Sequence, residues 1–494
     1  MVSVSDGGPV DPTGHPRRYQ VLVVCCLGLF LVVSALTSLN VALPAMQEDL
    51  NASNRDLQWI IDSYAIVFGG LLLTAGAVGD RIGRKPVLLA GFAVFALGGA
   101  LGALAGDVNG VILARAISGL GAAMMLPATL SVLTEVFIEE EQARAIALWA
   151  GIAGAGAAIG PALGGWLLEI SWWGSVFAMN AVIAGAAAVA TAIVVPRLPG
   201  SRGGRIDIPG AVLSTAAIGL LLYALIEAPG GWNEPVVIGT ALAGAAAVWL
   251  FLRHEASTAD PMLPLEVFAK PRLRVGAITL MLSAIGFAGV VFVASLHLQI
   301  GWGEGPLVTG LLILPIGLSE LVSSNRSVAL IRRFDTGSVI ATGLVIMAVG
   351  YVMMALTPTG DRLLFVIAGL IAGVGNGMVI APSVERVVGG AEPRLAGVTA
   401  GVNETSVELG ASLGVALLGG IQRLVFDGRL PDGVPSESVN EALAVADTEV
   451  VLEAFRLSSK AALIGAAIAV LSVIPWAGRR LESERDMRVK SVDA

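Results

Sequence analysis

The sequence predicts an all-α integral membrane protein, and three observations support this prediction. Of the 494 residues, 55% are hydrophobic and 14% are charged, whereas soluble globular chains carry about 25% charged residues. The apolar residues gather in runs of roughly 20 or more, the length that a helix needs to cross a bilayer. Most Lys and Arg residues fall in every second connection between these runs, as the positive-inside rule predicts for a chain that crosses repeatedly.

Fourteen apolar runs fit this description. They are expected at 20–43, 57–79, 87–106, 110–136, 145–168, 175–195, 208–227, 235–253, 274–299, 307–330, 338–357, 362–388, 397–424 and 458–477. An even number of spans places both termini on one side, and the basic connections indicate that this side is cytoplasmic. The long polar segment 425–457 is therefore expected outside, with an amphipathic helical pattern in its second part.

An internal repeat predicts the domain organisation. The glycines of 119–121 (GLG) recur 254 residues later at 373–375 (GVG), and GAAIGPALGG from Gly156 recurs at the same offset as GASLGVALLGG from Gly410. Parallel repeats of this size build alternating-access transporters. We expect two six-helix halves, with an inserted helix hairpin between them and a cytoplasmic tail after them. The predicted boundaries are 1–196 and 274–478 for the halves, 197–273 for the hairpin with its linkers, and 479–494 for the tail.

The predicted span at 397–424 carries two acidic residues, Glu404 and Glu408. A carboxylate at the centre of a membrane helix costs roughly 2.5–3.5 kcal/mol on insertion scales. Residues four apart lie on one helical face, and two like charges so close in a dry site cannot both ionise cheaply. One of them is expected to hold a proton near neutral pH, as a proton-coupled device requires. Alternatively, both glutamates line a wet vestibule or pair with arginines.

The connection at 76–85, GAVGDRIGRK, combines glycines that permit a tight turn with three basic residues. An ordinary basic loop is the simplest interpretation. The spacing, however, resembles the signature loop of the major facilitator superfamily, G-x-L-x-D-R-x-G-R-K. The resemblance implies the major facilitator fold and a loop that helps to latch the outward-open state. The residues that carry it are Gly76, Asp80, Arg81, Gly83, Arg84 and Lys85.

Arg115 lies within the predicted span 110–136, in RAISGLGAA. Because an arginine is always charged, this one must face a cavity or a carboxylate. The segment resembles the second motif of the superfamily, R-x-x-x-G-x-G-x-A, whose arginine is implicated in proton transfer. The alternative is a structural ion pair near the outer leaflet.

The predicted span 145–168 contains a glycine-rich stretch around a proline. Small residues allow helices to pack backbone to backbone, and a proline kinks the helix. Close packing alone would explain them, but the pattern G-x-x-x-G-P-x-x-G-G resembles the antiporter motif found in exporters of the superfamily. This resemblance favours efflux over import. The residues that match it are Gly156, Gly160, Pro161, Gly164 and Gly165.

Fourteen spans and three further segments, LNVALP at 39–44, QWIIDSYAIVFGG at 58–70 and DPMLPLEVF at 260–268, resemble the drug:proton antiporter-2 branch. Within it, the pattern is most similar to the quaternary-ammonium and multidrug exporters of the QacA type. That resemblance implies acidic residues on spans 1, 2, 10 and 13 that couple protons or bind substrate. The positions that match are Asp62, Glu320, Glu404 and Glu408, with Arg115 as their basic partner in the proton-transfer role.

Two positions depart from this pattern. The span 1 acid is replaced by Ala35, which puts the usual proton stoichiometry and the cationic preference in doubt. Arg326 is an added base in the span 307–330; it either neutralises a nearby acid or steers anionic groups.

The resulting hypothesis is a monomeric, multi-pass plasma-membrane transporter that exports hydrophobic, cationic drugs or biocides in exchange for protons. Its expected partners are the lipophilic substrate, protons and the bilayer, with no nucleic acid. A dedicated exporter of an endogenous metabolite, antibiotic or lipid with the same fold is the alternative. The sequence has no Walker loop, nucleophile elbow or metal cluster, so neither an enzyme nor a bound metal or cofactor is expected, and the proton motive force is the predicted energy source.

Overall fold

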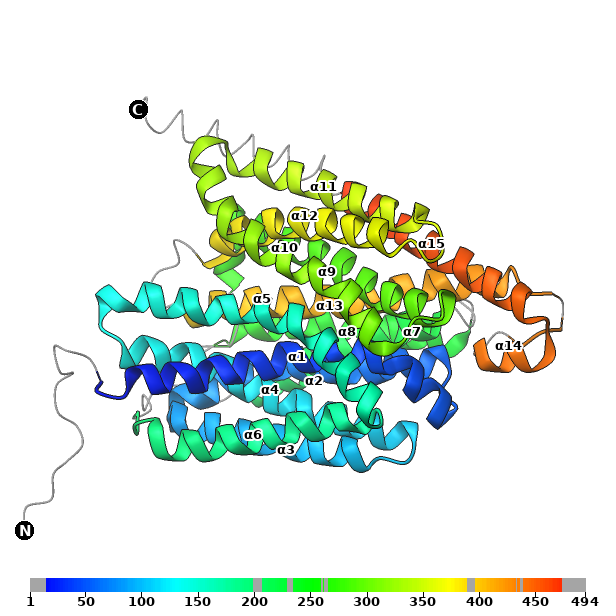
Figure 1. The fold of residues 1–494 in the computed structure, drawn as a ribbon. Coiled ribbons are helices and arrows are strands. Elements are labelled where there is room, and N and C mark those ends of the chain that lie inside the picture. Colours follow the sequence, from blue (N-terminus) through cyan, green and yellow to red (C-terminus); the bar gives the residue numbers. More distant parts are fainter. Residues whose placement is uncertain are drawn as a thin grey trace, which may run out of the picture.

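The structure is a computed structural model that describes residues 15–198, 207–228, 234–258, 261, 265–388, 396–431, 433–435 and 439–472. Within these residues the chain forms a bundle of helices and no strand (Figure 1). The long helices are α1 (Arg18–Leu50), α2 (Asn54–Ile82), α3 (Arg84–Leu104), α4 (Val108–Val136), α5 (Glu139–Ile170), α6 (Gly174–Val194), α7 (Ile208–Glu227), α8 (Pro235–Ser257), α9 (Pro271–Leu296), α10 (Pro306–Arg333), α11 (Thr336–Leu356), α12 (Arg362–Val388), α13 (Ala396–Asp427) and α15 (Thr448–Ser472). Three short elements complete them: the 3-10 turn η2 (Leu265–Ala269), the π-helical turn η3 (His297–Gly301) and α14 (Val439–Val445).

Each predicted span therefore coincides with one long helix of the described chain. Twelve helices in the described residues are long and apolar enough to cross a membrane, and α2 and α5 are the two long helices outside that set. The number of fourteen crossings stays a prediction. The all-helical membrane architecture is confirmed.

The helices form two groups on opposite sides of the bundle (Figure 1). We refer to α1–α6 as the N-terminal group and to α9–α13 with α15 as the C-terminal group. Helix α7 packs against both α2 and α13, and α8 packs on α7. The inserted hairpin therefore contacts both groups. The domain boundaries expected from the sequence stay predictions.

Glycines at repeat-related positions make the same kind of contact in both groups. A Cβ built on Gly160 of α5 would collide with Thr37 of α1, and one built on Gly414 of α13 would collide with the backbone of Ile285 in α9. In the same way, Gly119 lies on the backbone of α2 and Gly373 on that of α10. Each pair is 254 residues apart, so the sequence repeat corresponds to a repeated mode of close helix packing.

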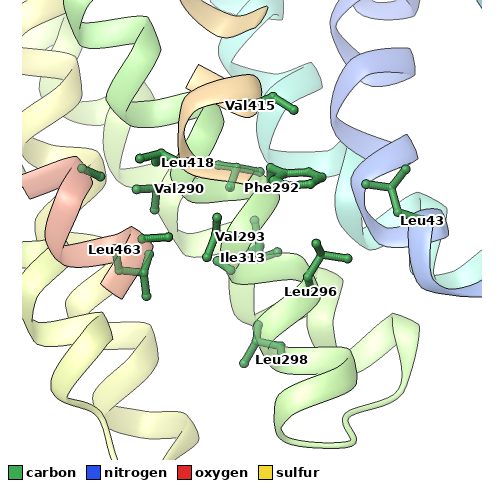
Figure 2. Close-up of a cluster of buried hydrophobic side chains, with 14 of the residues drawn as sticks. Leu43, Val290, Phe292, Val293, Leu296, Leu298, Ile313, Val415, Leu418 and Leu463 are labelled. Carbon is green, nitrogen blue, oxygen red and sulfur yellow. The ribbon is translucent and has the colours of Figure 1, made fainter. Parts of the chain in front are cut away.

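An apolar core joins the two groups at the end of the bundle where α1 ends. Figure 2 shows Leu43 of α1 near Phe292 of α9 and Val415 of α13, with further side chains from α10 and α15. Two hydrogen bonds lie at the same end: Ser295 Oγ donates to the Asn40 carbonyl over 2.7 Å, and Gln299 Nε2 donates to the Val41 carbonyl over 3.0 Å. A separate core lies within the N-terminal group.

Helix α15 begins ten residues before the predicted span at 458–477. Asp447 provides the reason, because its side chain accepts from the Glu449 N–H over 2.9 Å and its carbonyl accepts from the Val451 N–H. An N-terminal cap of this kind lets a helix start outside the apolar run. The amphipathic pattern predicted in the polar segment is thus divided between α14 and the first turns of α15.

Candidate functional site

Three charged side chains are buried where α2, α4 and α13 meet. Asp62 of α2 is 0% exposed, Arg115 of α4 is 2% exposed and Glu408 of α13 is 7% exposed. The two carboxyl groups lie close enough to the guanidinium to interact with it electrostatically. Glu404 is half-buried one turn before Glu408 and interacts with it as well. We call these four residues the seam cluster.

Arg115 is held by groups of α2 other than the acids. Its Nε donates to the Ile60 carbonyl over 3.0 Å, and its guanidinium carbon lies 4.3 Å from the centroid of the Tyr64 ring. This is cation–π geometry, which is worth ~2 kcal/mol or more when it is desolvated. Among the described residues Arg115 forms no ion pair within 4 Å, and its Nη2 is buried without a hydrogen bond. Its acidic neighbours therefore act through space rather than through a closed salt bridge.

Several polar atoms of the seam cluster are buried without a hydrogen-bond partner in the described chain. They include both carboxyl oxygens of Asp62, one of Glu408 and the hydroxyl of Tyr64. Ser412 of α13 lies beside Asp62, but its geometry falls short of a hydrogen bond. Because most buried polar atoms in proteins are hydrogen-bonded, such a concentration marks a place where a proton or a polar ligand would be favourably bound.

Small residues bring the three helices close enough to exclude lipid and water. A Cβ built on Gly69 of α2 would lie 4.0 Å from the Glu408 Cβ, and one built on Gly119 of α4 would collide with the Tyr64 backbone. Close packing at Gly69 of α2 and Gly119 of α4 therefore contributes to the burial of the seam cluster.

Glu320 is half-buried in a second polar site, formed within the C-terminal group. Its carboxyl lies beside the Asn376 amide of α12, and it also acts on the hydroxyl of Tyr351 in α11. Ser283 Oγ of α9 donates to Asn376 Oδ1 over 2.8 Å. The structure thus brings together Asp62, Arg115, Glu404 and Glu408 and places Glu320 with a different set of neighbours.

Sequence reasoning missed the neutral polar members of both sites. Ser412, Asn376, Ser283 and Tyr351 each interrupt an apolar helix, and that interruption was the available signal. It is weak, because a lone serine or threonine on a membrane helix often bonds its own backbone, as Thr279 does to the Val275 carbonyl.

The basic loop of the sequence forms the turn between α2 and α3. Gly83 has φ = 101°, a conformation that glycine adopts without strain. Arg84 bonds Ser131 and Glu135 of α4, and Lys85 Nζ donates to the carbonyls of Ala192 and Val195 over 2.9 and 2.6 Å.

The remaining members of this loop are less informative. Arg81 is exposed, Gly76 lies near Pro127 of α4, and the Asp80 side chain lies outside the described residues. Arg84 and Lys85 therefore connect the start of α3 to other parts of the N-terminal group. The latch role of the loop stays a prediction.

The glycine–proline motif places α5 between α1 and α10. A Cβ built on Gly160 or Gly164 would collide with α1, whereas one built on Gly165 would collide with Pro306 of α10. Gly310 of α10 in turn lies directly on the Pro161 backbone. Gly156 is packed against α1 as well. The motif thus lies at a contact between the two helix groups.

In the described part of the chain, no group of three or more His, Cys, Asp or Glu side chains could hold a metal ion. Apolar helices that enclose ionisable groups define a multi-pass membrane protein. The chain belongs to the Major Facilitator Superfamily, whose sequence model matches residues 25–415.

The chain is similar to several proteins of known activity. It is 32% identical over 459 residues to the multidrug efflux pump LfrA of Mycolicibacterium smegmatis, covering 90% of this chain and 91% of that protein. It is 30% identical to the tetracenomycin C resistance and export protein of Streptomyces glaucescens, covering 87% of this chain and 82% of that protein. It is 32% identical to the methyl viologen resistance protein SmvA of Salmonella typhimurium, covering 86% of this chain and 87% of that protein.

The fold is also found in a solved structure. A bacterial homologue of the human lysosomal transporter Spinster, in an inward-facing and unoccupied conformation, superposes with a TM-score of 0.68 at 15% identity, covering 95% of this chain and 98% of that one. At this identity the likeness concerns the fold alone. It agrees with the two-group bundle described above.

Proposed function

We propose that this protein is a plasma-membrane exporter that exchanges hydrophobic, cationic drugs or biocides for protons. The observation that carries the proposal is the seam cluster, in which Asp62, Glu408 and Arg115 are buried and Glu404 is half-buried between α2 and α4 of one helix group and α13 of the other. The similarity to resistance and efflux proteins supports drug-like cargo. The protein is expected to act as a monomer of the fourteen-helix antiporter branch, without chemical conversion of its cargo and without a cofactor.

The cluster can couple protons to a change of conformation because its charges lie on separate helix groups. When Glu408 and Asp62 are ionised, they attract Arg115 and a cationic substrate. Protonation removes that attraction and reduces the cost of burial. Each state thereby favours a different arrangement of α13 against α2 and α4, and a ligand shifts the balance by its differential affinity.

The orientation we propose places both termini in the cytoplasm. The α2–α3 turn, with Arg84 and Lys85, and the start of α1, with Arg17 and Arg18, then lie on the inner surface, as the positive-inside rule requires. Contacts between the helix groups, such as Ser295 with Asn40, lie at the opposite end. This arrangement corresponds to a bundle closed toward the outside.

Dye efflux from cells and inverted vesicles tests the proposal. Cells that produce the wild-type protein should extrude ethidium or methyl viologen, and a protonophore should stop extrusion. Asp62→Asn and Glu404→Gln should abolish it while the protein remains folded and in the membrane. Glu385→Gln is the matched control, because this exposed acid pairs with Arg272 outside the seam cluster. Unchanged export in both cluster variants would refute the assigned role.

A dedicated exporter of an endogenous metabolite, antibiotic or lipid is a second candidate. Two observations favour it: Ala35 occupies the position of the usual span 1 acid, and two similar proteins are described as exporters of single antibiotics, tetracenomycin C and cephamycin. A panel of dyes and biocides separates the candidates. A single-cargo exporter would leave resistance to the whole panel unchanged. One compound added outside acid-loaded proteoliposomes would still enter in exchange for protons and make the lumen less acidic.

A further inference from the structure

A groove of about 470 Å³ lies between α10 and α12. Two facing stripes of side chains form it, each with a spacing of four residues that keeps its members on one helical face. The apolar part of the lining is Leu318, Val322 and Leu330 on α10 and Leu370, Val374 and Met378 on α12. Its volume lies within the range of pockets that hold small organic molecules.

The groove opens on the outer surface of the bundle. Val322 is 55% exposed and Leu318 is 44% exposed, whereas Glu320 between them is turned toward Asn376 in the interior. Both α10 and α12 have the length and hydropathy of membrane-spanning helices. The open side of the groove therefore faces lipid rather than the seam cluster.

Arg326 completes the α10 stripe and is exposed. It has no hydrogen bond or ion pair among the described residues, so it does not neutralise Glu320 as one sequence-based alternative held. It lies seven residues before Arg333 at the helix end, or ~10 Å along the axis. This depth corresponds to the boundary between acyl chains and headgroups. From this depth a long arginine side chain reaches the interface, where an anionic headgroup is its favoured neighbour.

We propose that the groove is a binding site for an anionic glycerophospholipid of the adjacent leaflet. The Arg326 guanidinium would bind the phosphate, because its planar N–H groups can donate two parallel hydrogen bonds to phosphate oxygens. One acyl chain would follow the stripe from Arg326 to Leu318, ~12 Å along the helix. The site is separate from the seam cluster, so it does not depend on the identity of the cargo.

Lipid competition on the purified full-length protein tests this site. The wild-type chain, reconstituted in equal amounts of phosphatidylglycerol and phosphatidylcholine with identical acyl chains, should retain the anionic lipid preferentially when native mass spectra are recorded. The expected preference is about fivefold, which corresponds to the ~1 kcal/mol that one basic residue contributes near an anionic surface. Arg326→Gln should abolish the preference. Arg333→Gln, which changes a cation outside the groove on the same helix, should keep it.

A second pair of variants tests the apolar part of the groove. Val322→Trp should fill the groove and displace the bound lipid, whereas Leu311→Trp, at a position 51% exposed on α10 but outside the groove, should not. Both residues are lipid-facing, so neither substitution disturbs the helix interfaces. Equal retention of the two lipids by the wild-type protein would overturn the proposal. Equal loss in the Arg326 and Arg333 variants, or in the two tryptophan variants, would also overturn it.

Discussion

The seam cluster and the Glu320 site show two ways in which one bundle buries acidic groups. The seam cluster combines Asp62 and Glu408 with a cation, Arg115, and draws its members from both helix groups. Glu320 lies within the C-terminal group, against the neutral side chains of Asn376 and Tyr351. The first site contains opposite charges on helices of two different groups, whereas the second contains a single acid inside one packed group.

This difference has a direct consequence for mechanism. A protonation change in the seam cluster alters the attraction between two groups of helices, so it can be coupled to their relative movement. A protonation change at Glu320 alters a neutral hydrogen-bonded site, and its effect is confined to α9–α12. The seam cluster is therefore expected to dominate transport, and substitutions at Arg115, Glu408 and Glu320 can test that ranking.

The largest effect is expected for Arg115→Met. This substitution leaves Asp62 and Glu408 buried without their cation, which would cost roughly 3–5 kcal/mol if both stayed charged. They should instead take up protons, so the protein folds but export falls to background. Arg115→Lys restores the charge without the planar fork and should recover part of the activity. Dye efflux with a thermal unfolding assay on the same preparation provides the measurement. Full export by the Met variant would contradict the role of Arg115.

Glu408→Gln should abolish proton-driven export without weakening the fold. The amide retains the shape of the side chain, and its neutrality removes the repulsion from Glu404. The midpoint of thermal unfolding in detergent should therefore be unchanged or higher, whereas an imposed proton gradient should no longer drive uptake into inverted vesicles. A lower midpoint would show that Glu408 is mainly structural.

A smaller effect is expected for Glu320→Gln. The amide keeps the size and polarity of the carboxyl beside Asn376, so the loss is limited to roughly 1 kcal/mol, or about fivefold in export rate. Asn376→Leu is the companion variant, because it leaves the carboxyl without its polar neighbour and should be the more damaging of the two. If Glu320→Gln were as inactive as Glu408→Gln, the two sites would have to be functionally equivalent.

The smallest effect concerns Asp335, which caps α11 outside the membrane-spanning segment. Ser338 donates to this carboxylate from its hydroxyl and its backbone N–H, and these bonds lower the pKa of Asp335 below its usual value. Because the folded pKa is lowered, the stabilisation is complete above the unfolded value of about 3.9 and is lost as the pH falls through the folded value. Asp335→Ala should cost about 1 kcal/mol at neutral pH.

Asp335→Asn separates the cap from the charge. Asparagine is an equally good N-cap, so this variant should be nearly as stable as wild type at neutral pH. Because it has no carboxylate to protonate, it should not show the loss of stability that the wild-type protein shows at acid pH. The unfolding midpoints of each protein at pH 7 and at about pH 2, which lies below the ordinary Asp pKa of about 3.9, measure this difference. An identical pH dependence in the wild-type and Asn proteins would show that the charge contributes nothing. Equal midpoints of the wild-type and Ala proteins at pH 7 would show that the cap contributes nothing.

The long helices could be predicted because their signals are local. A run of apolar residues such as 338–357 becomes a helix wherever it is placed in a membrane, since its backbone groups must bond one another. The glycine repeat corresponds to a repeated packing mode in the structure, because only the absence of a side chain lets Gly160 and Gly414 approach a neighbouring helix. The presence of buried acids followed from their position within these runs.

Only the tertiary structure decided which acids meet. Asp62 and Glu320 both lie within long helices, and nothing in the sequence around them tells which neighbour each faces. That depends on the rotation of every helix about its axis, which is set by packing between residues hundreds of positions apart. The same packing turned Arg326 away from Glu320 and toward the groove, and it placed Arg115 over the Tyr64 ring. Helix formation is thus a local property of this chain, and the chemistry of its buried charges is a property of the assembled bundle.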